Sequence, residues 1–167
     1  MTARVVLRRP GPSDQAAFLA AVHRSAALHR PWVQPPKTAA QFRAWLRRQD
    51  DPAHCAFLVC DRDSGALAGV INISNIVRGV FRSAYLGYYA FAGHERRGYM
   101  RAGLRAAIRH AFGPLKLHRL EANIQPGNAA SLALARCCGF AKEGYSPRYL
   151  KIGGRWRDHE RWAIRAT

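Results

Sequence analysis

The feature that most constrains the fold lies at residues 85–103, where an aromatic segment with strand character passes through a short basic turn and one glycine into a helix. The first N–H groups of a helix have no intrahelical partner, and the aligned peptide dipoles place a partial positive charge at that end. Gly98 has no Cβ to keep a ligand away from the backbone. Arg96, Arg97 and Arg101 add positive charge. The segment predicts a cradle for a diphosphate, with an ordinary strand–helix turn as the alternative.

Two other phosphate-binding loops do not fit this sequence. It contains neither G-x-x-x-x-G-K-[ST] nor G-x-G-x-x-G. The phosphate loops of P-loop nucleotide-binding proteins and of dinucleotide-binding proteins are therefore excluded.

The hydrophobic pattern predicts one α/β domain. At 167 residues the chain is long enough to bury a core of its own. The expected strands are residues 5–8, 56–61, 67–76, 84–91, 117–124, 144–151 and 155–164. The expected helices are residues 14–23, 38–48, 98–112 and 128–139, and the proline-rich stretch 29–37 is expected to be a loop.

The connections predict how these strands pair. Short turns at Asp63-Ser64-Gly65 and Arg78-Gly79 predict an antiparallel meander of the second, third and fourth strands. A helix separates the fourth strand from the fifth, so this crossover predicts that they are parallel.

Four segments carry a family resemblance. The run E-R-R-G-Y-M resembles the Q/R-x-x-G-x-G/A acyl-CoA signature of the GCN5-related N-acetyltransferases, the GNAT superfamily, with Glu95 in the first position and Met100 in the last. Three further segments resemble the RimJ branch of this superfamily, the ribosomal-protein-alanine N-acetyltransferases. They are SNIVRG at 74–79 leading to YLGYY at 85–89, NAASLALARCCGF at 128–140 and EGYSPRYLKIGGRWRDHERWAI at 143–164. The resemblance covers roughly residues 66–164.

The resemblance implies a GNAT fold, an α/β (α+β) architecture with a mixed, mostly antiparallel sheet of about seven strands and helices on both faces. Its fourth and fifth strands would form a splayed parallel pair, and acetyl-CoA would insert between them, where unpaired backbone groups need partners. The implied cofactor contacts are Tyr88, Tyr89, Ala90, Phe91, Arg96, Arg97, Gly98, Tyr99, Met100, Arg101 and Asn128. An acidic Glu95 at the cradle opposes a diphosphate unless its side chain turns outward.

Ser131 is the candidate proton donor to the departing thiolate of CoA. Asn128 and Ser131 are one turn apart at a helix start, where the plain interpretation is a cap and a surface hydroxyl. The resemblance instead implies a cofactor contact from Asn128 and a Ser131 hydroxyl near the sulfur. Ala135 stands where many GNAT enzymes have a general-acid Tyr.

The acceptor amine determines how strong a base is needed. An N-terminal α-amine has a pKa near 8, against about 10.4 for lysine, so it loses its proton more easily. This favours an α-amine acceptor with a water-mediated base. Glu121 is a candidate base, with an exposed or ion-paired carboxylate as the alternative, and His94 and His118 are further options.

An acceptor groove is expected beside the wedge, since aromatic walls with a few polar anchors suit a peptide. Its candidate residues are Trp32, Asn75, Arg78, Phe81, Tyr85, Tyr149 and Trp156. Membership of the core is the alternative for each of them. Asp158 and His159 are expected to have structural roles in the terminal hairpin.

Composition limits the remaining functional classes of protein. The formal net charge of +17 allows weak contact with ribosomal RNA, although a solvated charged surface is the plainer interpretation. No apolar run approaches a membrane span and the first residues lack a signal-peptide core, so we expect a soluble, cytoplasmic protein. The spacing of the four cysteines predicts buried, reduced thiols and no metal site.

The sequence is therefore interpreted as one GNAT domain over residues 1–167 that moves acetyl from acetyl-CoA to a protein N-terminus, with a ribosomal protein as the expected partner. An enzyme that acetylates a small amine, such as an antibiotic or a polyamine, is the first alternative. A non-catalytic ribosome- or RNA-binding protein on a CoA-binding fold is the second.

Overall fold

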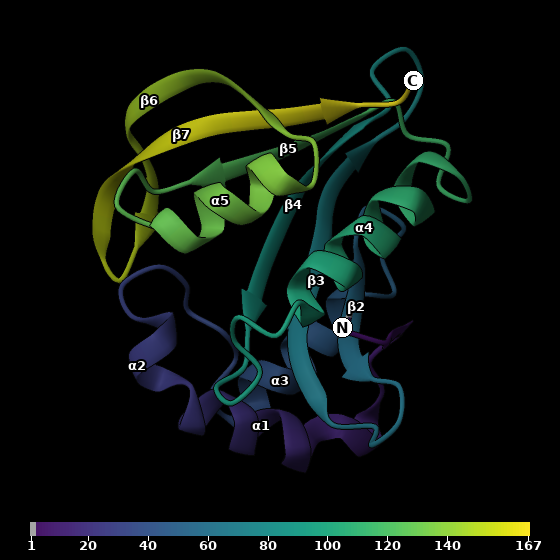
Figure 1. The fold of residues 1–167 in the computed structure, drawn as a ribbon, viewed down its shortest axis with the longest axis vertical. Coiled ribbons are helices and arrows are strands. Elements are labelled where there is room, and N and C mark those ends of the chain that lie inside the picture. The colour runs from purple at the N-terminus through teal and green to yellow at the C-terminus, as the bar shows by residue number, and fades with distance from the viewer. Residues whose placement is uncertain (1–2) are drawn as a thin grey trace.

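The structure, a computed structural model, describes residues 3–167 as a seven-stranded sheet with helices on both faces (Figure 1). The strands are β1 (Val5–Arg8), β2 (Cys55–Asp61), β3 (Leu67–Val77), β4 (Ser83–Ala90), β5 (Arg119–Ile124), β6 (Ala141–Ile152) and β7 (Arg155–Arg165). The helices are α1 (Gln15–Arg24), α2 (Ala26–His29), α3 (Ala39–Arg48), α4 (Tyr99–Phe112) and α5 (Ala129–Cys137), with a 3₁₀ turn η1 (Pro12–Asp14) before α1.

The strand order across the sheet is β1-β2-β3-β4-β5-β7-β6. Every neighbouring pair is antiparallel except β4 and β5, which are parallel. The expected meander and the expected parallel crossover are both confirmed. Helices α4 and α5 cover one face of the sheet, in front in Figure 1, and α1 and α3 pack on the other.

The parallel pair β4–β5 is joined at one end only. The paired positions are Ser83 with Arg119, Ala84 with Leu120 and Tyr85 with Glu121. Beyond Tyr85, β4 continues to pair with β3 and β5 continues to pair with β7, so their facing edges have separated. The expected splayed pair is confirmed, and its free backbone edges need partners.

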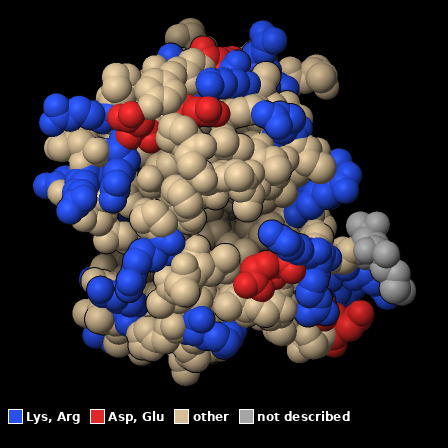
Figure 2. Space-filling view, turned by 60° about the vertical axis from the view of Figure 1, so that its left-hand side comes forward, with Lys and Arg blue, Asp and Glu red and all other residues tan. Residues whose placement is uncertain are grey.

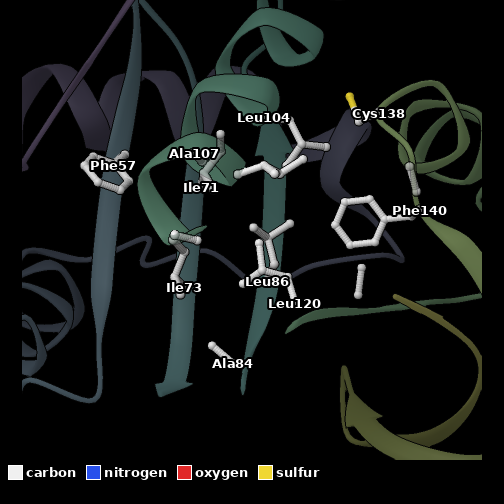
Figure 3. Close-up of a cluster of buried hydrophobic side chains, with 14 of the residues drawn as sticks. Phe57, Ile71, Ile73, Ala84, Leu86, Leu104, Ala107, Leu120, Cys138 and Phe140 are labelled. Carbon is white, nitrogen blue, oxygen red and sulfur yellow. The ribbon is translucent and has the colours of Figure 1, made fainter. Parts of the chain in front are cut away.

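Two hydrophobic cores hold the helices against the sheet. On one face, Leu104 and Ala107 of α4 pack in a cluster with Ile71, Leu86 and Leu120 from three neighbouring strands (Figure 3). On the other face, α1 and α3 contribute to an aromatic cluster: Phe18, Phe42, Trp45 and Phe91. Because one core holds β4 at Leu86 and the other holds its end at Phe91, the strand that borders the wedge is fixed from both sides.

The structure also differs from the sequence expectations in details. The short helix α2 was not predictable, because a single turn shows no periodicity. The Thr38 hydroxyl accepts the Gln41 N–H at 3.2 Å and starts α3 as expected, but the Gln41 side chain accepts from Lys37 N instead of completing a capping box. Cys137 is exposed, which corrects the expectation that all the thiols are buried.

No helix within residues 3–167 has both the length and the apolar character needed to cross a bilayer. Over the same residues, no three His, Cys, Asp or Glu side chains are grouped so that they could hold a metal ion.

Candidate active site

Two neighbouring cavities lie where β4 and β5 separate. The larger, of about 1210 Å³, is bordered by β4, α3 and the loop 30–37. The smaller, of about 90 Å³, lies between β4, β5 and the start of α5. Trp32, Val33, Gly87 and Tyr88 line both, so one opens beside the other. Figure 2 shows a hollow near the centre of one face, with basic side chains spread around it and a smaller number of acidic ones, one group of which lies beside the hollow.

The strand alternation of β4 decides which backbone groups face the wedge. The Phe91 N–H donates to the Ala68 carbonyl oxygen of β3 at 2.8 Å. Backbone groups along a strand point alternately to its two sides, so Tyr89 also points to β3, and Tyr88 and Ala90 point to the wedge. Of the four residues expected to pair with a pantetheine arm, Tyr88 and Ala90 therefore turn their backbone groups to the wedge, and Tyr89 and Phe91 turn theirs to β3.

His29, which the sequence analysis missed, hydrogen-bonds to one of these wedge-facing backbone groups, the Ala90 carbonyl. Its Nε2 lies 2.7 Å from Ala90 O, and its buried ring lies 5.1 Å from the Tyr89 ring. A carbonyl oxygen only accepts, so Nε2 carries the proton. Burial lowers the pKa of His29 and favours the neutral ring. The Ala90 carbonyl is thus held by the protein, and the Ala90 N–H remains for a ligand.

The predicted cradle has the expected helix start. Gly98 is the N-cap of α4 with φ of +83°, a left-handed conformation that favours glycine. The first backbone bond of the helix runs from Ala102 N to Gly98 O at 3.0 Å. Within residues 3–167, the N–H groups of Tyr99, Met100 and Arg101 have no backbone acceptor. These donors fit an anion such as a diphosphate.

Glu95 does not turn its charge toward those donors. Its carboxylate accepts the Gly93 N–H at 2.6 Å. Hydrogen bonds from its own N–H and from those of Gly93 and His94 lower the pKa of Glu95. The negative charge is therefore held by backbone N–H groups of the turn at residues 93–95.

Asn128 and Ser131 lie on the opposite wall of the wedge. The Asn128 side chain accepts the Ser131 N–H at 3.3 Å and caps α5 as expected. The Ser131 hydroxyl lies 3.0 Å from the Tyr88 hydroxyl, and the Tyr88 hydroxyl lies 3.0 Å from the Ser131 carbonyl oxygen. Burial raises the pKa of Tyr88 to about 12, so this hydroxyl keeps its proton. Both candidates line the smaller cavity.

Glu121 does not line either cavity. It lies opposite Tyr85 at the last paired position of β5, before the wedge opens. Arg119 Nε donates to its carboxylate at 2.8 Å, and the same guanidinium pairs with Glu143. This geometry matches the alternative of an ion-paired carboxylate.

The other histidines considered as a base also lie elsewhere. The His94 ring packs 5.4 Å from the Tyr99 ring in the cradle turn. His118 is exposed and precedes β5 at the paired end of the strands.

Among the expected groove residues, Trp32 alone lines the two cavities. Tyr85 hydrogen-bonds to Tyr149, which raises the pKa of Tyr85. Arg78 donates to Leu115 O at 2.6 Å. The remaining expected residues, Asn75, Phe81 and Trp156, are exposed outside both cavities. The β3–β4 turn precedes the paired end of β4, so its residues lie away from the open end of the wedge.

The lining residues that the sequence analysis missed come from separate segments. They are His29, Arg30, Lys37, Trp45, Arg48, Asn72, Arg157 and His159. The concentration of proline, tryptophan and basic residues at 30–37 was the one local signal for this wall. Asp158, by contrast, accepts from the Tyr145 hydroxyl and the Arg148 N–H, which is the structural role expected of it.

Comparison with known proteins decides the family. Residues 4–141 match the family model described as the acetyltransferase (GNAT) domain. The chain belongs to the GNAT acetyltransferase family. This GNAT chain is 44% identical over 103 residues to the [ribosomal protein uS5]-alanine N-acetyltransferase of Escherichia coli K12, which covers 62% of this chain and 53% of that protein.

Two further similarities bear on this GNAT domain. It is 28% identical over 114 residues to spermidine N(1)-acetyltransferase of Vibrio cholerae, covering 68% of this chain and 65% of that protein. The structure titled Mycobacterium smegmatis RimJ in complex with CoA-disulfide matches it with a TM-score of 0.89 and 29% identity, over 97% of this chain and 82% of that one. The chain spans about half to two thirds of the length of these curated relatives. The GNAT fold and the RimJ resemblance are confirmed.

Proposed function

We propose that this protein transfers an acetyl group from acetyl-CoA to the N-terminal α-amine of a protein, with a ribosomal protein as the acceptor. The observation that carries the proposal is the one-ended β4–β5 pair, which opens a wedge bordered by Tyr88 and Ser131. The 44% identity to the Escherichia coli enzyme supports the choice of a ribosomal acceptor.

The wedge fits the three parts of acetyl-CoA. The Tyr88 carbonyl oxygen and the Ala90 N–H would pair with the amides of the pantetheine arm. The free N–H groups at the start of α4, with Arg101, would hold the diphosphate. Asn128, at the start of α5, would contact the arm from the other wall.

The chemistry requires little beyond positioning and charge stabilisation. The bound cofactor supplies an activated thioester. A neutral amine can attack that carbonyl directly, and the Tyr88 N–H, which faces the wedge beside Ser131, would donate to the oxygen on which negative charge develops. Ser131 would donate its proton to the leaving sulfur.

The larger cavity favours a peptide over a polyamine. Its described lining includes Arg30, Lys37, Arg48 and Arg157 and contains no Asp or Glu. While one amine of a polyamine reacts, its other amines stay positively charged, and the basic side chains of this cavity would repel them. A peptide N-terminus carries one positive charge, which it loses before it attacks. The relationship to a spermidine acetyltransferase is the reason to test this alternative.

The surface charge supports an auxiliary contact with ribosomal RNA. The net charge is +17, and basic side chains are spread over the face in Figure 2 instead of forming one stripe. Such a distribution suits weak, salt-sensitive attraction more than sequence-specific recognition. A ribosomal acceptor would place the protein in the cytoplasm.

The test is a comparison of acceptors at pH 7.5 with saturating acetyl-CoA, measured as thiol release. We expect kcat/KM for peptides that begin with Ala, Ser or Thr to exceed the value for spermidine at least about ten-fold, or about 1.4 kcal/mol. The runs are repeated at raised salt, which screens non-specific attraction between the basic surface and the anionic cofactor, so that turnover at a specific site should persist. Faster turnover of spermidine would overturn the choice of acceptor.

A further inference from the structure

His159 lies inside the wedge although it belongs to the terminal hairpin. It is on β7, paired with Ser146 of β6, and its relative exposure is 3%. It lines the smaller cavity together with Asn128, Ser131 and Tyr88. The hairpin therefore brings one imidazole to the cavity that holds the proposed proton donor.

The hydrogen bonding of His159 defines which ring nitrogen is available. Nδ1 lies 2.9 Å from the carbonyl oxygen of Arg157. Because a carbonyl oxygen only accepts, Nδ1 must carry the proton. In the neutral ring Nε2 then has a free lone pair. This is the arrangement of a general base, a ring held by one nitrogen with the other free to take a proton.

The other groups around the cavity do not compete for that role. Those that face His159 are Tyr88 of β4, Asn123 and Gln125 at the end of β5, Asn128 and Ser131 at the start of α5, and Tyr149 and Ser146 of β6. Among the described residues that line the smaller cavity, His159 alone carries an imidazole. Of the charged neighbours in sequence, Asp158 is hydrogen-bonded by Tyr145 and Arg148, and Arg157 lines the larger cavity.

We propose that His159 is the general base that takes a proton from the acceptor amine during acetyl transfer. The inference rests on the proposed function. The acceptor ammonium gives one proton to Nε2, and the neutral nitrogen then forms the C–N bond with the thioester carbon. The C–S bond breaks with its electron pair on sulfur, which takes the Ser131 proton. Ser131 recovers a proton from the acceptor nitrogen, which becomes the amide, and His159 releases its proton to water.

The test is His159→Asn, because the Asn side-chain amide can replace the Nδ1–H donor but cannot act as a base. His118→Asn is the matched control, since His118 is exposed and lies outside both cavities. At pH 7 and saturating peptide, kcat of His159→Asn should fall about 100-fold. Its KM and its Kd for acetyl-CoA, measured by calorimetry, should stay within about 3-fold of wild type.

The pH profile separates a base from a structural residue. Wild-type kcat should fall as pH drops, because the base must be unprotonated to act, whereas kcat of the variant should follow the fraction of acceptor amine that is already neutral and so keep rising up to about pH 9. Its deficit should shrink at pH 9, where an α-amine with a pKa near 8 is already neutral. A variant kcat within about 3-fold of wild type, or a wild-type kcat without an acidic limb, would overturn the assignment.

Two further results keep the outcomes distinct. If His159→Asn melts at a much lower temperature than wild type, His159→Gln is measured in the same way, and wild-type activity in that variant would overturn the assignment. Failure of wild type to acetylate any peptide while it turns over spermidine would instead reject the proposed function, and that result needs no variant.

Discussion

The Ser131 hydroxyl donates to the Tyr88 hydroxyl at 3.0 Å, and the Tyr88 hydroxyl donates to the Ser131 carbonyl oxygen at 3.0 Å. This reciprocal pair joins β4 to α5 across the wedge, inside the smaller cavity. It fixes the rotamer of Ser131, and the Tyr88 hydroxyl can accept or donate as the Ser131 proton moves. Tyr88 is therefore a positioning residue for the proposed proton donor.

A double-mutant cycle tests this pair. Ser131→Ala should lower kcat about 10- to 100-fold and leave the Kd for acetyl-CoA within about 3-fold, because the hydroxyl acts on the leaving sulfur. Tyr88→Phe should lower kcat less, and the double variant should be no slower than Ser131→Ala, since Tyr88 acts through Ser131. Kinetics with a peptide acceptor measure all three. If the two single losses, expressed as activation free energies, add up in the double variant, the two hydroxyls act independently.

Gly98 should be required for cofactor binding because of its place at the start of α4. Gly98→Asp brings a negative charge to the proposed diphosphate site and should raise the Kd for acetyl-CoA at least about ten-fold. Gly98→Asn is the matched control, since Asn has the same size, tolerates positive φ and is neutral. A Cβ at this position comes no closer than 3.8 Å to Ala3, so both side chains have room. Equal calorimetric Kd values for the two variants would contradict a diphosphate site at this helix start.

His29 should make the protein less stable in acid. Its folded pKa is lowered by burial from the ordinary value of 6.5. Below pH 6.5 the unfolded chain binds a proton that the folded protein does not, so the free energy of unfolding falls as pH drops toward the folded pKa. Urea unfolding at pH 7.5 and pH 5.0 should show a smaller acid loss for His29→Gln than for wild type.

His118→Gln serves as the control for His29, because His118 is exposed and its side chain should contribute little. At pH 7.5 His29→Gln should itself be less stable by about 1–3 kcal/mol, since the buried bond to Ala90 O is disturbed. An unchanged acid dependence in His29→Gln would show that His29 is protonated in the folded protein.

Glu121 should be dispensable for turnover. Its carboxylate is paired with Arg119 at a position where β4 and β5 are still joined. Glu121→Gln should keep kcat within about 3-fold and lower the free energy of unfolding by less than about 1 kcal/mol, the usual value of a partly exposed ion pair. A large loss of kcat together with a shifted pH profile would show that Glu121 is the base and would contradict the assignment of His159.

The cofactor side of the site could be predicted because its signals are local. Gly98 before a helix, Asn128 three residues before Ser131 and the aromatic strand 84–91 each act on neighbouring residues of the chain. The structure adds that alternate residues of β4 face the wedge, which depends on the bond from Phe91 to Ala68 and so on the register with β3.

The acceptor side could not be predicted in the same way, because distant segments build it. The Gln34 side chain lies 3.9 Å from the position that a Cβ on Gly153 would occupy, so the loop 30–37 meets the β6–β7 turn only in three dimensions. Arg78 was expected in the groove as a polar anchor flanking the wedge, but no local pattern tells which end of β4 opens. His159 was expected to be structural, and its Nδ1 bond to Arg157 is consistent with that, although its ring also borders the wedge.

The most direct test of the central claim is to locate the acetyl group on a product by mass spectrometry. The acceptor is a peptide that begins with Ala and carries one internal Lys, incubated with the protein and acetyl-CoA at pH 7.5. The proposed function predicts a single acetyl group on the N-terminal amine, because that amine loses its proton more easily than lysine. Acetylation of the lysine side chain, or of spermidine in place of the peptide, would contradict it.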